Sequence, residues 1–217
     1  FRICHRFGQI DQGLENFFGL DNAVTCLALD YGITNWLMIG LSHSTLNKEN
    51  VGFVKTKLLR QKKDGMPLSL SYFGSASVQT FTTPTLDTGQ TYYFSNRLCY
   101  THQLLIARKF SDKLSLQIMP TIFHQNLVDS TSFDNDVISL GVGGRIKVSK
   151  RIAITGEYYY RLTGVDNLAG TNKTYNSLSI GADIETGGHV FQLFFSNSSG
   201  VTERAFLSQT NHSWTDG

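Results

Sequence analysis

The chain has 217 residues and a formal net charge of +2, with 41% hydrophobic residues, 20 glycines and only 3 prolines. This near-neutral balance, without a run of like charges, gives no sign of nucleic-acid binding. No stretch approaches 18 consecutive apolar residues, which excludes a transmembrane helix. The chain opens on Phe1 rather than Met, so we expect residues 1–217 to be a single domain truncated at both ends.

Segments of alternating apolar and polar residues recur along the whole chain, which is typical of β-strands. In chain order, strands are predicted at residues 1–7, 22–31, 36–43, 51–61, 67–76, 92–110, 114–124, 136–148, 152–161, 175–185 and 189–197.

The connections between these strands alternate between short and long. Short polar turns are predicted at Gly32–Asn35, Lys62–Met66, Ser111–Lys113, Ser149–Arg151 and Glu185–Gly188. Longer polar connections are predicted at Gly8–Asn22, Ser44–Asn50, Ser77–Thr91, Gln125–Asn135 and Leu162–Thr174, and the tail from Ser198 is interpreted as a sixth. Strands of about nine to eleven residues, with short turns on one rim and long loops on the other, are typical of an outer-membrane β-barrel. A soluble barrel remains the alternative, because this pattern is weak in any single strand.

The alternation assigns a charged face to each strand. In an outer-membrane barrel the apolar face meets lipid and the polar face lines the lumen. Eight basic residues fall on the inward face against four acidic ones, which favours anions in a narrow pore. The residues predicted to line the lumen are Lys55, Lys57, Arg97, Gln103, Arg145, Lys147, Glu157, Arg161 and Asp183. Cross-strand ion pairs that fill a sealed barrel would produce the same pattern.

Several longer motifs carry a family resemblance. They are FRICHRFG, FFGLD, KLLRQ, MPLSLSYF, YFSNRL, LIARKFSDKLSLQIMPT, NDVISLG, EYYYRL and DIETGGHVFQLFF, in this order. The chain resembles, over essentially its whole length, a family of Bacteroidota outer-membrane β-barrel proteins known as the domain of unknown function numbered five-seven-seven-seven. The resemblance implies an all-β, antiparallel, up-and-down transmembrane barrel in the bacterial outer membrane, and it implies no activity. One departure is His102, where the resemblance leads us to expect an aromatic residue on the lipid side.

No catalytic or metal-binding constellation is recognisable. The six histidines are scattered, and no GxSxG elbow, HExxH motif or Walker loop is present. We therefore expect no enzyme activity, cofactor or metal. Outer-membrane lipid is the expected surrounding, other outer-membrane or periplasmic proteins are possible partners, and nucleic acid is not.

Three functions are compatible with these features. The first is a narrow, porin-like channel or transporter with an anion-leaning lumen, and the second is a structural or assembly barrel that anchors partner proteins. An outer-membrane enzyme ranks last because no constellation supports it.

Three details are specific enough to check. Cys4 and Cys26 are predicted to lie opposite each other on the first two strands, within reach of a disulfide. Pro120 is predicted to interrupt strand pairing, because proline has no N–H donor. Finally, the first and eleventh strands should run in the same direction and not pair. We therefore expect a twelfth strand beyond Gly217, since single-chain bacterial barrels have an even number of strands.

Overall fold

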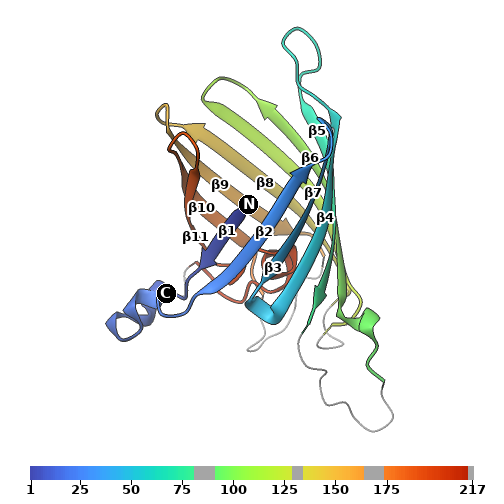
Figure 1. The fold of residues 1–217 in the computed structure, drawn as a ribbon, viewed down its shortest axis with the longest axis vertical. Helices are drawn as coiled ribbons and strands as arrows, with labels where there is room; N and C mark the ends of the chain where they lie inside the picture. Colours follow the sequence, from blue (N-terminus) through green and yellow to red (C-terminus); the bar gives the residue numbers. More distant parts are fainter. Residues whose placement is uncertain (81–90, 129–133, 164–173, 215–217) are drawn as a thin grey trace.

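Eleven antiparallel strands form one continuous sheet that curls into a barrel in the computed structural model (Figure 1). The structure describes residues 1–80, 91–128, 134–163 and 174–214. The strands are Arg2–Arg6 (β1), Val24–Gly32 (β2), Leu37–Ser44 (β3), Glu49–Leu59 (β4), Ser69–Gln79 (β5), Leu98–Lys109 (β6), Leu114–Gln125 (β7), Asp136–Lys147 (β8), Ile152–Arg161 (β9), Ser177–Glu185 (β10) and Val190–Ser196 (β11). The helices are Ile10–Gln12 (η1), Leu14–Gly19 (η2), Leu46–Lys48 (η3), Phe94–Arg97 (η4) and Glu203–Ser208 (α1).

Each strand pairs with its neighbours in sequence, from β1 through β11. One rim of the barrel carries the connections β2–β3, β4–β5, β6–β7, β8–β9 and β10–β11, and we call it the turn rim. These connections are residues 33–36, 60–68, 110–113, 148–151 and 186–189. The opposite end is called the long-loop rim. The predicted all-β, up-and-down antiparallel topology is confirmed.

Two sequence-based boundaries are wrong. Residues 92–97 are not strand: η4 occupies Phe94–Arg97 and β6 begins only at Leu98. The connection between β3 and β4 is also short, since only Thr45 to Lys48 separate the two strands. This reversal is tight because Asn47 and Lys48 adopt positive φ angles of 55° and 47°. Glu49 therefore lies in β4 and not in a long loop.

The two edge strands do not pair with each other in the described part of the chain. Ten successive antiparallel pairings make β1 and β11 run in the same direction, as expected from the sequence. Their side chains still meet at one point, where the guanidinium carbon of Arg6 lies 4.7 Å from the ring centre of Phe194. Near the long-loop rim, Gln9 Nε2 donates a 2.7 Å hydrogen bond to His212 Nδ1. The twelfth strand stays a prediction.

Pro120 interrupts pairing on one side only. Its pairing with Leu140 of β8 is regular. On the β6 side, the ladder runs from Gln103–Thr121 directly to Ile106–Ile118, and no pair is formed opposite Pro120. The register is unchanged across the gap, so two successive pairs are skipped without a bulge. The predicted interruption is confirmed.

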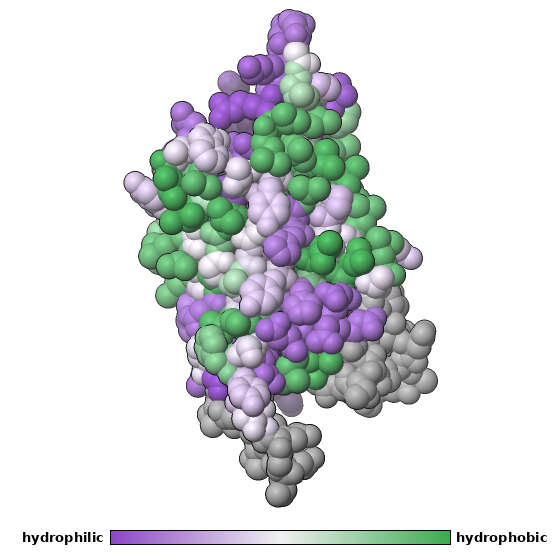
Figure 2. All heavy atoms as spheres, turned by 90° about the vertical axis from the view of Figure 1, so that its right-hand side faces the viewer, coloured by the Kyte–Doolittle hydropathy of each residue, from purple (hydrophilic) through white to green (hydrophobic). Residues whose placement is uncertain are grey.

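The outer wall of the barrel is predominantly apolar. Figure 2 shows one side of it, where hydrophobic atoms cover broad areas and hydrophilic atoms gather at the upper end and in a patch toward the lower end. His102 is exposed on this wall and shares a 2.6 Å hydrogen bond with the Tyr72 hydroxyl. Tyr72 therefore provides a polar partner for the one residue that departs from the family pattern. No helix within the described residues is long and apolar enough to cross a membrane.

Candidate functional site in the barrel lumen

The segment that follows β11 turns back into the lumen. Figure 1 shows its short helix, α1, inside the ring of strands. We call residues Ser198–Thr210 the plug. Its buried residues are Ser198, Thr202, Arg204, Ala205, Leu207 and Thr210, each 8% exposed or less. The prediction that this tail crosses the outer rim as a sixth long loop is therefore wrong. The reason is the run Ala205–Phe206–Leu207, which packs against apolar residues inside the barrel.

Hydrogen bonds connect the plug to strands that are far from it in the sequence. Thr202 Oγ1 donates to Glu49 Oε2 of β4 at 2.6 Å. Arg204 Nη1 donates to the Cys99 sulfur of β6 at 3.1 Å. The backbone N–H of Tyr175, just before β10, donates to the carbonyl of Thr210 at 2.7 Å. The plug thus contacts opposite parts of the wall rather than one strand alone.

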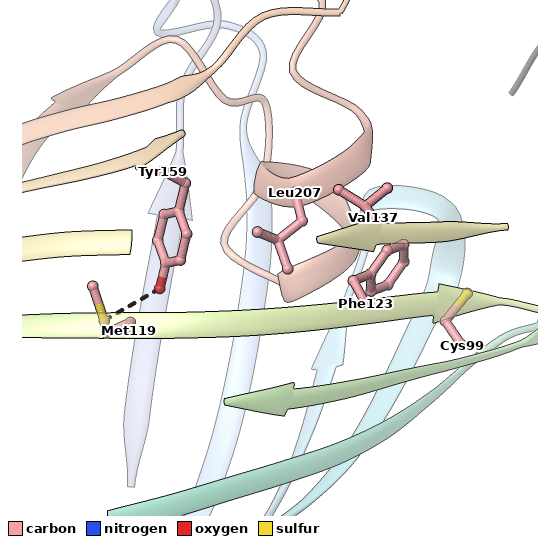
Figure 3. Close-up of a cluster of buried hydrophobic side chains, with 6 residues drawn as sticks. All are labelled: Cys99, Met119, Phe123, Val137, Tyr159 and Leu207. Carbon is pink, nitrogen blue, oxygen red and sulfur yellow. Dashed lines mark hydrogen bonds between the residues drawn. The ribbon is translucent and has the colours of Figure 1, made fainter. Parts of the chain in front are cut away.

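An apolar cluster fills the lumen below the helix. Figure 3 shows Leu207 pointing from α1 toward the strands, between Tyr159 on one side and Phe123 and Val137 on the other. Cys99 and Met119 complete the cluster, and Phe206 lies with its ring centre 5.0 Å from that of Tyr159. Met119, Phe123 and Val137 are large apolar residues on the inward faces of β7 and β8, and they are the sequence signal for this cluster, because a fully wet lumen would not need them.

A cavity of about 470 Å³ lies between the plug and the turn rim. We call it the polar cavity after the charged, amide and hydroxyl side chains among its lining residues, although apolar side chains also contribute to its surface. Residues of β6 to β11 and Arg6 of β1 form its wall, while Gly200, Val201 and Phe206 of the plug close its other end. The lumen therefore has two halves: an apolar half that the plug fills and a polar half that contains this cavity.

Charged side chains of both signs line the cavity. Arg145 Nε lies 3.1 Å from Asp183 Oδ2, and Gln192 Nε2 donates to Asp183 Oδ1 at 2.9 Å. Arg6 and Glu157 line the same space. Neither has an ion-pair partner among the residues that the structure describes.

The nine predicted lumen residues fall into three groups. Arg145, Glu157 and Asp183 come together in the polar cavity. Gln103 and Arg161 are buried in the wall, and Gln103 Nε2 donates to Thr121 Oγ1 at 3.1 Å and to the Tyr159 hydroxyl at 3.3 Å. The remaining residues are separate from the cavity lining: Lys55, Lys57, Arg97 and Lys147.

These four are spread over β4, β8 and η4. Lys55 and Lys57 share the face of β4 that carries the buried Glu49 and Val51. Lys147 ends β8 near the turn rim. Arg97 does not belong to a strand: it ends η4, with its guanidinium carbon 5.3 Å from the ring centre of Tyr92.

Sequence reasoning missed the acidic residues around the plug. The sequence pattern predicts Glu49 in a loop and Glu203 in the tail. In the structure, Glu49 is only 2% exposed and lies inside the barrel. Glu49, Glu203 and Arg204 form a second group of charged side chains, at the plug. No group of three or more potential metal ligands occurs among the described residues.

Comparisons with known proteins agree with this architecture. A family model described as a membrane bound beta barrel domain (DUF5777) matches residues 1–217. A solved structure described as a NanC porin is similar to the chain with a TM-score of 0.57 and 10% sequence identity. The similarity covers 85% of this chain and 86% of that chain. Among curated proteins, none matches the sequence.

Proposed function

Because the chain belongs to the DUF5777 family of membrane-bound β-barrel domains, we propose that it is a narrow outer-membrane channel for small polar solutes, with the plug as its gate. Outer-membrane localisation and a porin-like barrel follow from the family and from the similar porin fold. Conduction, gating and selectivity are the steps that the proposal adds.

The observation that carries the proposal is the polar cavity that ends at a non-covalently held plug. A structural barrel has no need of a charged cavity of about 470 Å³. The plug closes the other half of the lumen through hydrogen bonds and apolar contacts, all of which are reversible. If α1 left the lumen, the cavity would extend toward the long-loop rim.

An anion preference would come from Lys55 and Lys57. Neither lysine has an ion-pair partner within the described residues, whereas Asp30 is 3.7 Å from Arg2 and Asp183 is paired with Arg145. Uncompensated positive charge between low-dielectric walls concentrates anions. Because four of the charged lumen residues neutralise one another in these pairs, we expect a modest preference for anions over cations.

Conductance in planar bilayers tests this function. We expect brief, small conductance steps from the parent protein. The double variant Thr202→Val with Arg204→Gln, which removes two hydrogen bonds of the plug, should open more often and for longer. Absence of conductance from both proteins, each shown to be folded, would exclude a channel.

The alternative is a structural or assembly barrel that anchors partner proteins at the outer membrane. The observation in its favour is the apolar cluster around Leu207, which closes half of the lumen. This alternative predicts a stable partner that co-purifies from native membranes in stoichiometric amount, together with no conductance in either state of the plug.

A further inference from the structure

We propose that the polar cavity is a binding site for a small zwitterionic solute of about the size of a dipeptide. In this site Arg6 holds the carboxylate of the solute and Glu157 holds its ammonium group. The inference rests on the proposed channel, which would bring the solute to the cavity. It names the class of solute that the channel would recognise.

Glu157 presents a free carboxylate to the cavity. Its side chain is exposed to the lumen. Its direct cross-strand neighbours are Gly143 on β8 and Ser179 on β10, which carry no charge and leave room beside it. No hydrogen bond or ion pair within the described residues engages its oxygens. A carboxylate in a partly enclosed space is expected to find a cationic partner.

Arg6 presents an incompletely satisfied guanidinium to the same cavity. Its guanidinium carbon stacks 4.7 Å from the ring centre of Phe194, another lining residue. Its Nε atom is buried and has no hydrogen-bond partner. Because a guanidinium is always charged and offers five donors in a plane, a carboxylate is its best match.

The remaining charges of the cavity exclude singly charged solutes. Arg145 and Asp183 already neutralise each other at 3.1 Å. A solute with only negative charge would meet Glu157 unpaired, and a solute with only positive charge would meet Arg6 unpaired. A solute that carries one charge of each sign satisfies both residues at once, and it leaves the Arg145–Asp183 pair intact.

The separation of Arg6 and Glu157 sets the length of the solute. β10 and β11 lie between β9, which carries Glu157, and β1, which carries Arg6. Two strand spacings of about 4.8 Å already separate β9 from β11. A dipeptide, which extends by about 3.5 Å for each residue, spans more of this separation than a free amino acid does. The cavity volume of about 470 Å³ lies in the usual range for small-molecule sites.

Calorimetric titration of the folded, full 217-residue chain in detergent tests the proposal with three probes. Glycylglycine carries both charges, N-acetylglycylglycine only the carboxylate, and glycylglycine amide only the ammonium group. We expect glycylglycine to bind at least about tenfold more tightly than either of the others, since each lost pairing is worth at least about that factor.

Two variants assign the ends of the solute. Glu157→Gln should abolish the difference between glycylglycine and N-acetylglycylglycine, because the ammonium group then has no partner. Arg6→Gln should abolish the difference between glycylglycine and glycylglycine amide. A purely structural role for either residue would lower the affinity for all three probes by the same factor, and that result would overturn the proposal.

A third variant tests the cavity by filling its volume, without a change of charge. A Cβ atom at Gly143 would meet its nearest neighbour, the methyl carbon of Met119, at an ordinary 3.5 Å. Gly143→Leu can therefore fill the cavity without a backbone clash, and it should abolish glycylglycine binding. Lys113→Gln, at the turn rim and outside the cavity lining, is the matched control and should bind like the parent.

The same preparations are then measured in planar bilayers, which separates this inference from the channel on which it rests. Binding of the three probes in the expected pattern, without conductance, would support the proposed binding site and contradict the proposed channel function. Conductance without glycylglycine binding, or equal affinity for the three probes, would overturn the site and leave the channel standing.

Discussion

Thr202 of the plug donates a 2.6 Å hydrogen bond to Glu49 of β4, a residue 153 positions earlier in the chain. Both side chains are buried, and the second carboxylate oxygen of Glu49, Oε1, has no hydrogen-bond partner within the described residues. The contact joins the plug to the far part of the wall. It is therefore the first place to test whether the plug can be loosened.

Replacing Thr202 with Val should release the plug more often, because the variant leaves a buried carboxylate without its donor. The loss is about 1–3 kcal/mol. Cys99 is 2% exposed beneath the plug, so its rate of labelling by a thiol reagent reports release, and we expect that rate to rise at least about fivefold. Thr186→Val, in an exposed turn, is the control. An unchanged labelling rate in Thr202→Val would show that the contact does not hold the plug.

The seating of the plug should depend on pH through Glu203, which lies in α1 and not in a spanning strand. Burial raises the pKa of this carboxyl from its ordinary 4.5 to about 7. A backbone hydrogen bond and Arg2 act against this rise in pKa, whereas the Glu49 and Glu157 carboxylates contribute to it. The seated plug favours the protonated form, so its stability is fully present below pH 4.5 and is lost as pH rises through about 7.

The measurement is Cys99 labelling in the parent relative to Glu203→Gln at each pH, because the ratio cancels the intrinsic pH dependence of the thiol. We expect this ratio to rise between about pH 5 and about pH 8. A ratio that stays constant over this pH range would show that Glu203 does not control the seating of the plug.

Reversing the charge of Lys55 and Lys57 to Glu should shift the reversal potential in a salt gradient toward cations. Four negative charge units would separate the double variant from the parent on the inner face of β4, and a narrow lumen magnifies such a change. Lys113→Glu at the turn rim should have a much smaller effect. If the reversal potential of the double variant matches that of the parent, β4 does not set selectivity.

Cys4 and Cys26 lie directly opposite each other on β1 and β2, as the sequence predicts, and both are free thiols in the structure. Directly opposite residues have Cα atoms about 4.5–5.5 Å apart, within the range that a disulfide spans. Mild oxidation should therefore link them, with a loss of two free thiols by mass spectrometry. Cys99 serves as the internal control, because it is buried beneath the plug. Recovery of three free thiols after oxidation would contradict this expectation.

The strands and their two faces could be predicted because both depend on local information. Alternation places Leu27, Leu29 and Tyr31 on the outer wall, and the structure finds all three exposed. The error at residues 92–97 has a local cause as well. Tyr92, Tyr93 and Phe94 have high β-propensity, and nothing in the sequence marks the break at Phe94.

The plug could not be predicted in the same way. A six-residue helix carries almost no periodic signal, and it has no stability outside its packing environment. Its partners, Glu49 and Cys99, lie 153 and 105 residues away from the residues that they contact. The sequence predicts Arg145, Glu157 and Asp183 on the inward face, but it does not predict that they line one cavity. The proximity of Arg6 to Phe194 depends on how the two edge strands approach each other, which the sequence does not show.

The position of the plug also has a consequence for the order of folding. Its contacts with β4 and β6 can form only after those strands occupy their places in the wall, and closing such long chain loops has a large entropic barrier. The strands, in contrast, pair with neighbours in sequence, and each hairpin can form locally. The plug is therefore the last part to dock, and the earliest complete barrel is one in which the lumen is still empty. That intermediate should expose the apolar cluster to water for a short time, and a chaperone that recognises apolar surface would act at this stage.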